Sequence, residues 1–220
     1  MIERIIRYIS IFIALLIVLP LHEFAHAFVA DKSGDFTPRV SGRYTLNPLA
    51  HFDVLGLVMF IVAGFGWAKP VPVNPVNFRH YKLDCFLVAA AGIVVNYLTA
   101  FVFLPLLYLS AYVPEFGLFT DVLQSALYYI VSFSLVFCVF NLIPVFPLDG
   151  FRIMDCFVKR KGRVYYNYKV YGIYVLYALI LLSFIADVTG LHYLDILGIA
   201  INFVVHYISI PITAFWGLFF

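Results

Sequence analysis

Charge and cysteine are both scarce in this sequence, and each shortage excludes a class of protein. Only 12% of the 220 residues are charged, whereas 64% are hydrophobic, and the mean hydropathy is +1.00. A water-soluble domain of this length does not have such a composition. The net charge of +2 is too small to indicate a nucleic-acid partner. Cys85, Cys138 and Cys156 show no Cys-x-x-Cys spacing, so they predict neither a disulfide framework nor a sulfur-ligated metal site.

Alternation between polar and apolar residues is also absent, because the apolar runs are continuous. Continuous runs exclude a membrane β-barrel and predict an all-α polytopic membrane protein with five to six transmembrane helices. The segment 54–67 has only about 14 residues and several glycines, which is too short to cross about 30 Å of hydrocarbon. It therefore predicts a re-entrant segment near 54–77. The full spans are predicted at about 5–30, 84–113, 121–146, 170–187 and 196–218, the last of which contains Pro211.

The predicted spans form one integral-membrane domain over residues 1–220. Its core covers about 8–158, and two additional spans follow at the C-terminal end. The connection 151–169 is rich in Lys and Arg, so the positive-inside rule places it in the cytoplasm. If segment 54–67 re-enters the membrane without crossing it, the first helix runs from outside to inside, and Arg4 and Arg7 are external, against that rule. If the segment crosses the membrane, the first helix runs in the opposite direction.

The first apolar run ends in His22-Glu23-Phe24-Ala25-His26, which is a His-Glu-x-x-His motif. On a helix, residues four apart lie on one face, so His22 and His26 can bind one metal ion together. Glu23 lies beside them, where its carboxylate can act as a general base on a water molecule. The motif predicts a catalytic zinc centre at membrane depth.

Two other interpretations of this segment stay open. The three polar residues could be satisfied core residues of a helical bundle, although ionisable groups inside a membrane usually mark function. Alternatively, Arg4, Arg7 and the apolar stretch 8–21 resemble a secretory signal peptide with an Ala-x-Ala cleavage pattern at 25–27. Cleavage there would split the motif. The hydrophobic character of the rest of the chain favours a retained first span.

Catalytic zinc usually takes three protein ligands, so the chain must supply one more. The candidate is Asp149, which follows the apolar run 121–140 and lies beside Gly150. Pro144 and Pro147 interrupt the helix just before it, and irregular backbone at membrane depth is tolerated where it lines protein or a water-filled cavity. The alternative is a solvated aspartate in a loop that ends the helix.

These motifs together resemble the site-2 proteases, a family of intramembrane zinc metalloproteases. The segment 22–26 fits the family's zinc-binding helix, and Leu148-Asp149-Gly150, preceded by Asn141, fits its second signature. The run 91–96 resembles the Gly-Pro-x-x-Asn pattern of the intervening span, with Ile93 where proline is common. The resemblance covers about residues 8–158. It looks closest to the compact branch that lacks a PDZ domain.

The resemblance implies one Zn²⁺ per chain, ligated by His22, His26 and Asp149, with Glu23 as the catalytic base. It implies Asn96 and Asn141 as oxyanion or substrate contacts, although hydrogen bonds between helices are an equal alternative for both. The implied substrate is a membrane-spanning protein or peptide, cut within or near its transmembrane segment in regulated intramembrane proteolysis. The implied location is the cell membrane. Segment 54–77 would pair with extended substrate by strand addition, over a short edge because of its prolines.

Two competing classes need no zinc centre of this kind. A non-enzymatic polytopic membrane protein, such as a transporter or an inactive protease relative, would share the hydrophobic frame alone. A membrane di-iron oxygenase would need repeated histidine clusters, and the chain holds only one His-x-x-x-His pair. The single motif with a separate aspartate favours the protease.

Overall fold

The structure is a computed structural model and describes residues 1–63 and 66–220. Within these ranges the chain is helical and forms no strand. Residues 64 and 65, which lie inside the predicted re-entrant segment, fall outside the described residues. Five helices of the described chain are long and apolar enough to cross a membrane, which confirms the predicted all-α polytopic class. They are α1 (Ile2–Lys32), α5 (Tyr81–Ser110), α6 (Leu118–Leu142), α8 (Arg163–Thr189) and α9 (Ile196–Trp216).

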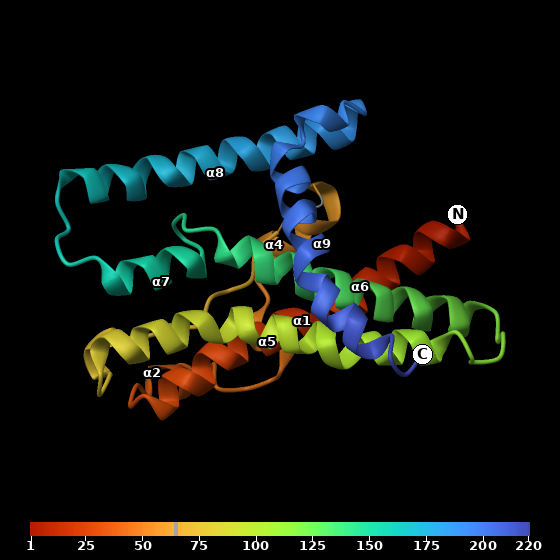
Figure 1. Ribbon diagram of the computed structural model, residues 1–220, viewed down its shortest axis with the longest axis horizontal. Coiled ribbons are helices and arrows are strands. Elements are labelled where there is room, and N and C mark those ends of the chain that lie inside the picture. Colours follow the sequence, from red (N-terminus) through yellow and green to blue (C-terminus); the bar gives the residue numbers. More distant parts are fainter. Residues whose placement is uncertain (64–65) are drawn as a thin grey trace.

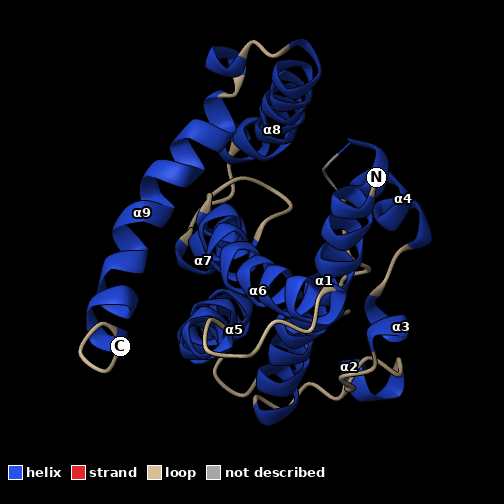
Figure 2. Cartoon of the chain, turned by 90° about the vertical axis from the view of Figure 1, so that its right-hand side faces the viewer, coloured by secondary structure: helices blue, strands red, loops and turns tan. Residues whose placement is uncertain are grey.

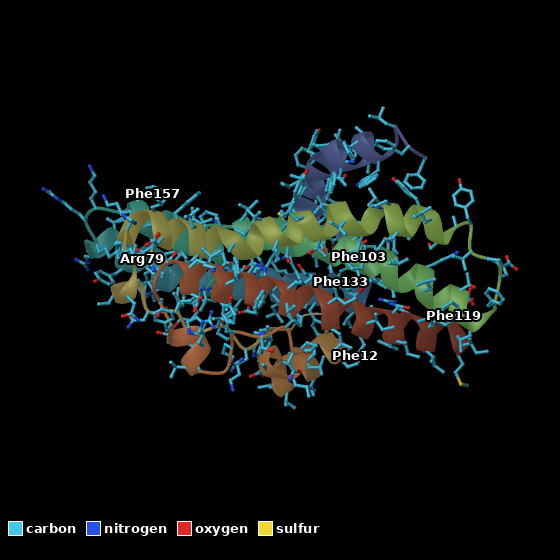
Figure 3. All side chains as sticks on the ribbon, turned by 90° about the horizontal axis from the view of Figure 1, so that it is seen from below. Phe12, Arg79, Phe103, Phe119, Phe133 and Phe157 are labelled. Atoms are coloured by element: carbon cyan, nitrogen blue, oxygen red, sulfur yellow. The ribbon has the colours of Figure 1, made fainter. Side chains whose placement is uncertain are left out.

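Helices α1, α5 and α6 pack against one another and form the centre of the molecule (Figure 3). Ala14 and Val18 of α1 are fully buried against Ile130 of α6, and Phe103 and Phe133 pack around them. Small side chains such as alanine let helix backbones approach closely inside a membrane. Helix α5 therefore lies directly against α1, the helix that carries the His-Glu-x-x-His motif.

Helices α8 and α9 lie outside this three-helix centre. Figure 1 shows α8 set apart from the bundle, and Figure 2 shows α9 crossing its flank. Helix α9 is joined to α5 by a 2.8 Å hydrogen bond from Trp216 Nε1 to the carbonyl of Phe101. Pro211 lies inside α9 and does not end it, in agreement with the prediction of a fifth span. Most of the side chains on both helices are exposed, and most of these exposed side chains are apolar, which suits contact with lipid.

Two helix boundaries differ from the prediction by more than about three residues. Helix α6 ends at Leu142 and not at 146, because Pro144 forces Ile143 into extended backbone with ψ of 125°. Helix α8 begins at Arg163, about seven residues before the predicted 170. Its first two turns are rich in tyrosine, a residue that suits the membrane–water interface, so the helix extends beyond the purely apolar run.

The chain after α6 turns back into α7 (Asp149–Phe157), which packs against α5. Asp149 is therefore the first residue of a helix, although the prolines before it had suggested an irregular segment. Arg79 and Phe157 lie at one end of the bundle, and Phe119 lies at the other (Figure 3). This places the regions around residues 79 and 157 at the same end of the bundle.

Between α1 and α5 the described part of the chain forms only short elements. They lie on the side of α1 opposite α5 (Figure 3). An isolated antiparallel bridge joins Phe52 to Ala68, and the N–H of Lys69 donates to the carbonyl of His51 at 2.7 Å. Helix α4 has 10 residues, too few to cross a membrane, in agreement with the prediction for this segment. The short elements are α2 (Thr37–Val40), α3 (Pro48–His51), α4 (Val54–Ala63) and the 3₁₀ turn Pro75–Asn77.

Candidate metal centre

His22 and His26 lie one turn apart on the same face of α1. Their rings meet edge to face, with centroids 4.7 Å apart, and their Nε2 atoms are 3.1 Å apart. Both residues are buried, with 7% and 3% of their surface exposed. The four-residue spacing of the motif produces this juxtaposition, because side chains at i and i+4 of a helix stack above one another.

Asp149 reaches the same point from the start of α7. Its Oδ2 lies 3.3 Å from His22 Nε2 and 3.1 Å from His26 Nε2. The aspartate is also buried, at 4% exposed, and its other oxygen lies 3.6 Å from the guanidinium of Arg152. The three residues form the only cluster of three or more metal-type ligands within residues 1–63 and 66–220.

The spacing of these three atoms fits a tetrahedral metal ion. Ligand atoms about 2.0–2.1 Å from a tetrahedral zinc ion lie about 3.3–3.4 Å from one another. The three measured separations are 3.1, 3.1 and 3.3 Å. Apart from the two imidazoles, the buried Oδ2 of Asp149 has no hydrogen-bond partner among the described residues, which is costly for a carboxylate unless a cation is bound there. The donor set, two imidazoles and one carboxylate, is typical of catalytic zinc sites.

Helix α5 supplies the wall behind the two imidazoles. The carbonyl oxygen of Val88 lies 2.7 Å from His26 Nδ1, and the side-chain amide of Asn96 lies 3.1 Å from His22 Nδ1. Gly92 lies between them on the same helix face. A Cβ atom at Gly92 would lie 2.4 Å from His22 Cε1 and 2.5 Å from His26 Nε2. Only glycine leaves room for both rings here.

Glu23 lies beside the cluster and is itself buried, at 9% exposed. Its Oε2 accepts a 2.9 Å hydrogen bond from the backbone N–H of Val71. The segment 67–74 therefore crosses directly over the carboxylate. This contact orients one carboxylate oxygen and leaves Oε1 without a hydrogen-bond partner in the described part of the chain.

Asp35 fastens the same segment to the end of α1. It is fully buried and accepts hydrogen bonds from the backbone N–H of Asn74 at 2.7 Å and from the amide of Asn77 at 2.8 Å. Burial acts to raise the pKa of Asp35, but these bonds and those from Thr37 outweigh it and hold the pKa below its usual range. The carboxylate therefore stays ionised, which keeps segment 67–74 in place over Glu23.

The structure brings most of the predicted site residues together. His22, His26 and Asp149 converge, Glu23 adjoins them, and Asn96 contacts His22. Asn141 does not join them through a hydrogen bond: its amide donates to the carbonyl of Phe137 at 3.1 Å, one turn earlier in α6.

Sequence reasoning missed the Val88 carbonyl, gave Gly92 no role although it belongs to the run that resembles the Gly-Pro-x-x-Asn pattern, and missed the Val71 N–H. The spacing of residues 88, 92 and 96, four apart on one helix face, is the signal that could have identified the first two. The contact of Val71 with Glu23 depends on the path of a proline-rich loop, for which the sequence carries no periodic signal.

The fold and the site together define a polytopic membrane protein with a buried metal-type centre of two histidines and one aspartate. The model for peptidase family M50 matches residues 115–183, which include Asp149. A Bacillus subtilis protein described as "Putative zinc metalloprotease YwhC" is 43% identical over 145 residues, 65% of this chain and 66% of that protein. A Mycobacterium tuberculosis protein described as "Putative zinc metalloprotease Rip2" is 30% identical over 152 residues, 67% of this chain and 57% of that protein.

The chain belongs to peptidase family M50, the site-2 protease family. The match spans somewhat less than two thirds of the length of these two relatives, 66% and 57% respectively. No solved structure matches the chain significantly. Membership of the family agrees with the resemblance that the His-Glu-x-x-His and Leu-Asp-Gly motifs carry.

Proposed function

We propose that this chain is an intramembrane zinc metalloendopeptidase. It would hydrolyse peptide bonds within or near the transmembrane segments of membrane-anchored proteins, in the cell membrane. The observation that carries the proposal is the convergence of His22 Nε2, His26 Nε2 and Asp149 Oδ2 within 3.3 Å of one another, beside the buried carboxylate of Glu23. A transporter or another non-enzymatic membrane protein has no need for this combination.

His22, His26 and Asp149 would hold one zinc ion per chain. Bound zinc supplies Lewis acidity, which polarises a substrate carbonyl and makes a water molecule more acidic. Glu23 would accept the proton of the attacking water at Oε1, because Val71 already occupies Oε2. It would then return that proton to the amine nitrogen of the leaving peptide. Asn96 is the better placed of the two asparagines to contact the oxyanion or the substrate, because it lies against His22, whereas the Asn141 amide donates within α6.

The substrate must present an extended backbone, because a helix hides its carbonyl groups in its own hydrogen bonds. The segment 67–74 would lie alongside such a strand over the site. Its donors are few: the N–H groups of Lys69 and Val71 are already bonded, and Pro70 and Pro72 have none. A substrate strand would therefore pair mainly by donating to carbonyl groups of this segment, over a short edge.

The core of about residues 8–158 would be the catalytic part of a single membrane domain, because α1, α5, α6 and α7 supply all of the proposed site residues. The spans α8 and α9 would complete the domain toward the lipid, since their side chains are mostly exposed.

Glu23→Gln tests the proposed reaction. The substitution keeps the size and the hydrogen-bond acceptor but removes the proton-accepting carboxylate. We expect cleavage of a reconstituted transmembrane peptide to fall by about 10²–10⁴-fold, the usual contribution of a general base, while bound zinc is unchanged. Glu3→Gln is the matched control, because Glu3 is an exposed residue near the start of the same helix. Cleavage by Glu23→Gln at the wild-type rate would rule out the proposed base.

A further inference from the structure

Residues 88, 92 and 96 of α5 face the two imidazoles, and only two of them offer a hydrogen-bonding group. The Val88 carbonyl serves His26 and the Asn96 amide serves His22. Gly92, between them, lets the rings come into contact with the helix. These two contacts determine which ring nitrogen of each histidine carries the proton.

For His26 the protonated nitrogen follows from the hydrogen-bond partner of Nδ1, the carbonyl of Val88. A backbone carbonyl can only accept, so Nδ1 must carry the proton and donate it to Val88 across 2.7 Å. In a neutral ring the Nε2 atom then keeps its lone pair. That lone pair is on the side of the ring that faces Asp149 and His22. His26 is thus prepared to bind a metal ion through Nε2.

His22 needs the same tautomer but has a different partner. Its Nε2 lies 3.3 Å from Asp149 Oδ2, so the lone pair must be on Nε2 if this nitrogen is a ligand. The proton is then on Nδ1, which needs an acceptor. The atom placed 3.1 Å from Nδ1 is the amide nitrogen of Asn96, a donor, whereas the Asn96 oxygen is buried without a hydrogen-bond partner in the described chain.

A half-turn of the Asn96 amide about its last bond supplies that acceptor. The oxygen and the NH₂ group of a primary amide have nearly the same shape, so the exchange requires no repacking around this fully buried side chain. Oδ1 then accepts the proton of His22 Nδ1. The NH₂ group takes the buried place of the unpartnered oxygen.

We propose that Asn96 is a positioning residue whose amide oxygen accepts from His22 Nδ1–H and thereby directs the Nε2 lone pair of His22 at the metal ion. Val88 does the same for His26, so α5 sets the tautomer of both ligands. Outer partners of this kind fix ring orientation and raise ligand basicity, and their loss typically costs about 10–100-fold in metal affinity. The inference rests on the proposed function, because it assumes that His22 is a ligand.

Two substitutions separate an accepting role from a donating one. Asn96→Asp keeps an acceptor at the same distance but has no N–H to donate, and the positive charge of a bound dication offsets its added negative charge. Asn96→Leu removes both the acceptor and the N–H donor. We expect Asn96→Asp to bind metal with close to wild-type affinity and Asn96→Leu to bind it about 10–100-fold more weakly. The measurement is chelator competition for Zn²⁺ on the detergent-solubilised full chain, with the visible spectrum of bound Co²⁺ as a report of tetrahedral geometry.

Thr99→Val is the matched control. Thr99 is a buried polar residue one turn further along α5, and its hydroxyl donates only to the carbonyl of Val95. This variant should keep wild-type affinity and the wild-type Co²⁺ spectrum.

Affinity of Asn96→Asp as weak as that of Asn96→Leu would overturn the accepting role, and wild-type affinity in Asn96→Leu would remove any positioning role. If Asn96→Leu does not fold, the comparison of Asn96→Asp with wild type decides alone, since retained affinity supports the inference and loss overturns it. Wild-type protein that binds neither metal would contradict the proposed function itself. That result is distinct from a failure of the Asn96 variants alone.

Discussion

Adding one methyl group at Gly92 is expected to eliminate metal binding. The new Cβ would lie 2.4 Å from His22 Cε1, 2.5 Å from His26 Nε2 and 2.7 Å from His22 Nδ1. Carbon atoms do not approach that closely, so both rings must move. Helix α5 cannot retreat, because it packs against α1 and α6 together. The imidazoles would therefore turn away from Asp149.

We expect the zinc affinity of Gly92→Ala to fall by at least about 100-fold. Loss of an outer partner alone costs about 10–100-fold, and here the ligands themselves are displaced. Peptide cleavage should be lost with the metal. Gly172→Ala is the control for a methyl group added to a membrane helix, because its Cβ would meet Val145 Cγ1 at an ordinary 3.4 Å. Wild-type zinc content in purified Gly92→Ala would show that α5 does not press on the ligands.

Gly150→Ala is expected to damage the same centre from the other side. A Cβ at Gly150 would lie 2.3 Å from the carbonyl oxygen of Leu142 and 2.6 Å from that of Ile143. Both atoms belong to backbone at the end of α6, which cannot rotate away as a side chain can. The first turn of α7 would have to move, and Asp149, the neighbour of Gly150, would move with it.

Because Gly150→Ala leaves both imidazoles in place, it should weaken zinc binding without erasing it, in contrast to Gly92→Ala. We expect the affinity to fall by at least about 10-fold, the low end of the cost of losing an outer partner, and by less than in Gly92→Ala, since one proposed ligand of three is displaced while the others remain. Chelator competition beside the Gly172→Ala control measures the difference. Equal zinc affinity in Gly150→Ala and wild type would mean that the start of α7 does not hold the third ligand.

The arrangement of the two histidines could be predicted because it depends only on local geometry. A helix places residues four apart on one face, whatever surrounds it. The five spans were equally accessible, since each is a continuous apolar run. Asp149 was harder, because no local rule connects residue 149 to residue 22. It was identified from the number of ligands that zinc requires and from the resemblance to the family, and its role as a ligand stays a prediction.

What the sequence did not predict depends on how elements pack. The importance of Gly92 arises from the register between α5 and α1, and that of Gly150 from the return of α7 onto the end of α6. Gly150 is helical, and a side chain is excluded at this position by the neighbouring carbonyl groups of Leu142 and Ile143. The hydrogen bond from Val71 to Glu23 likewise depends on the anchoring of its loop by Asp35.

The zinc content of the purified chain, with His26→Ala and Asp149→Ala beside it, tests the central claim most directly. Elemental analysis should find one zinc ion per wild-type chain and little in either variant, because each substitution removes one of the three proposed protein ligands. Full zinc content in Asp149→Ala, or none in a folded wild-type chain, would contradict the assignment of this buried cluster as the catalytic metal centre.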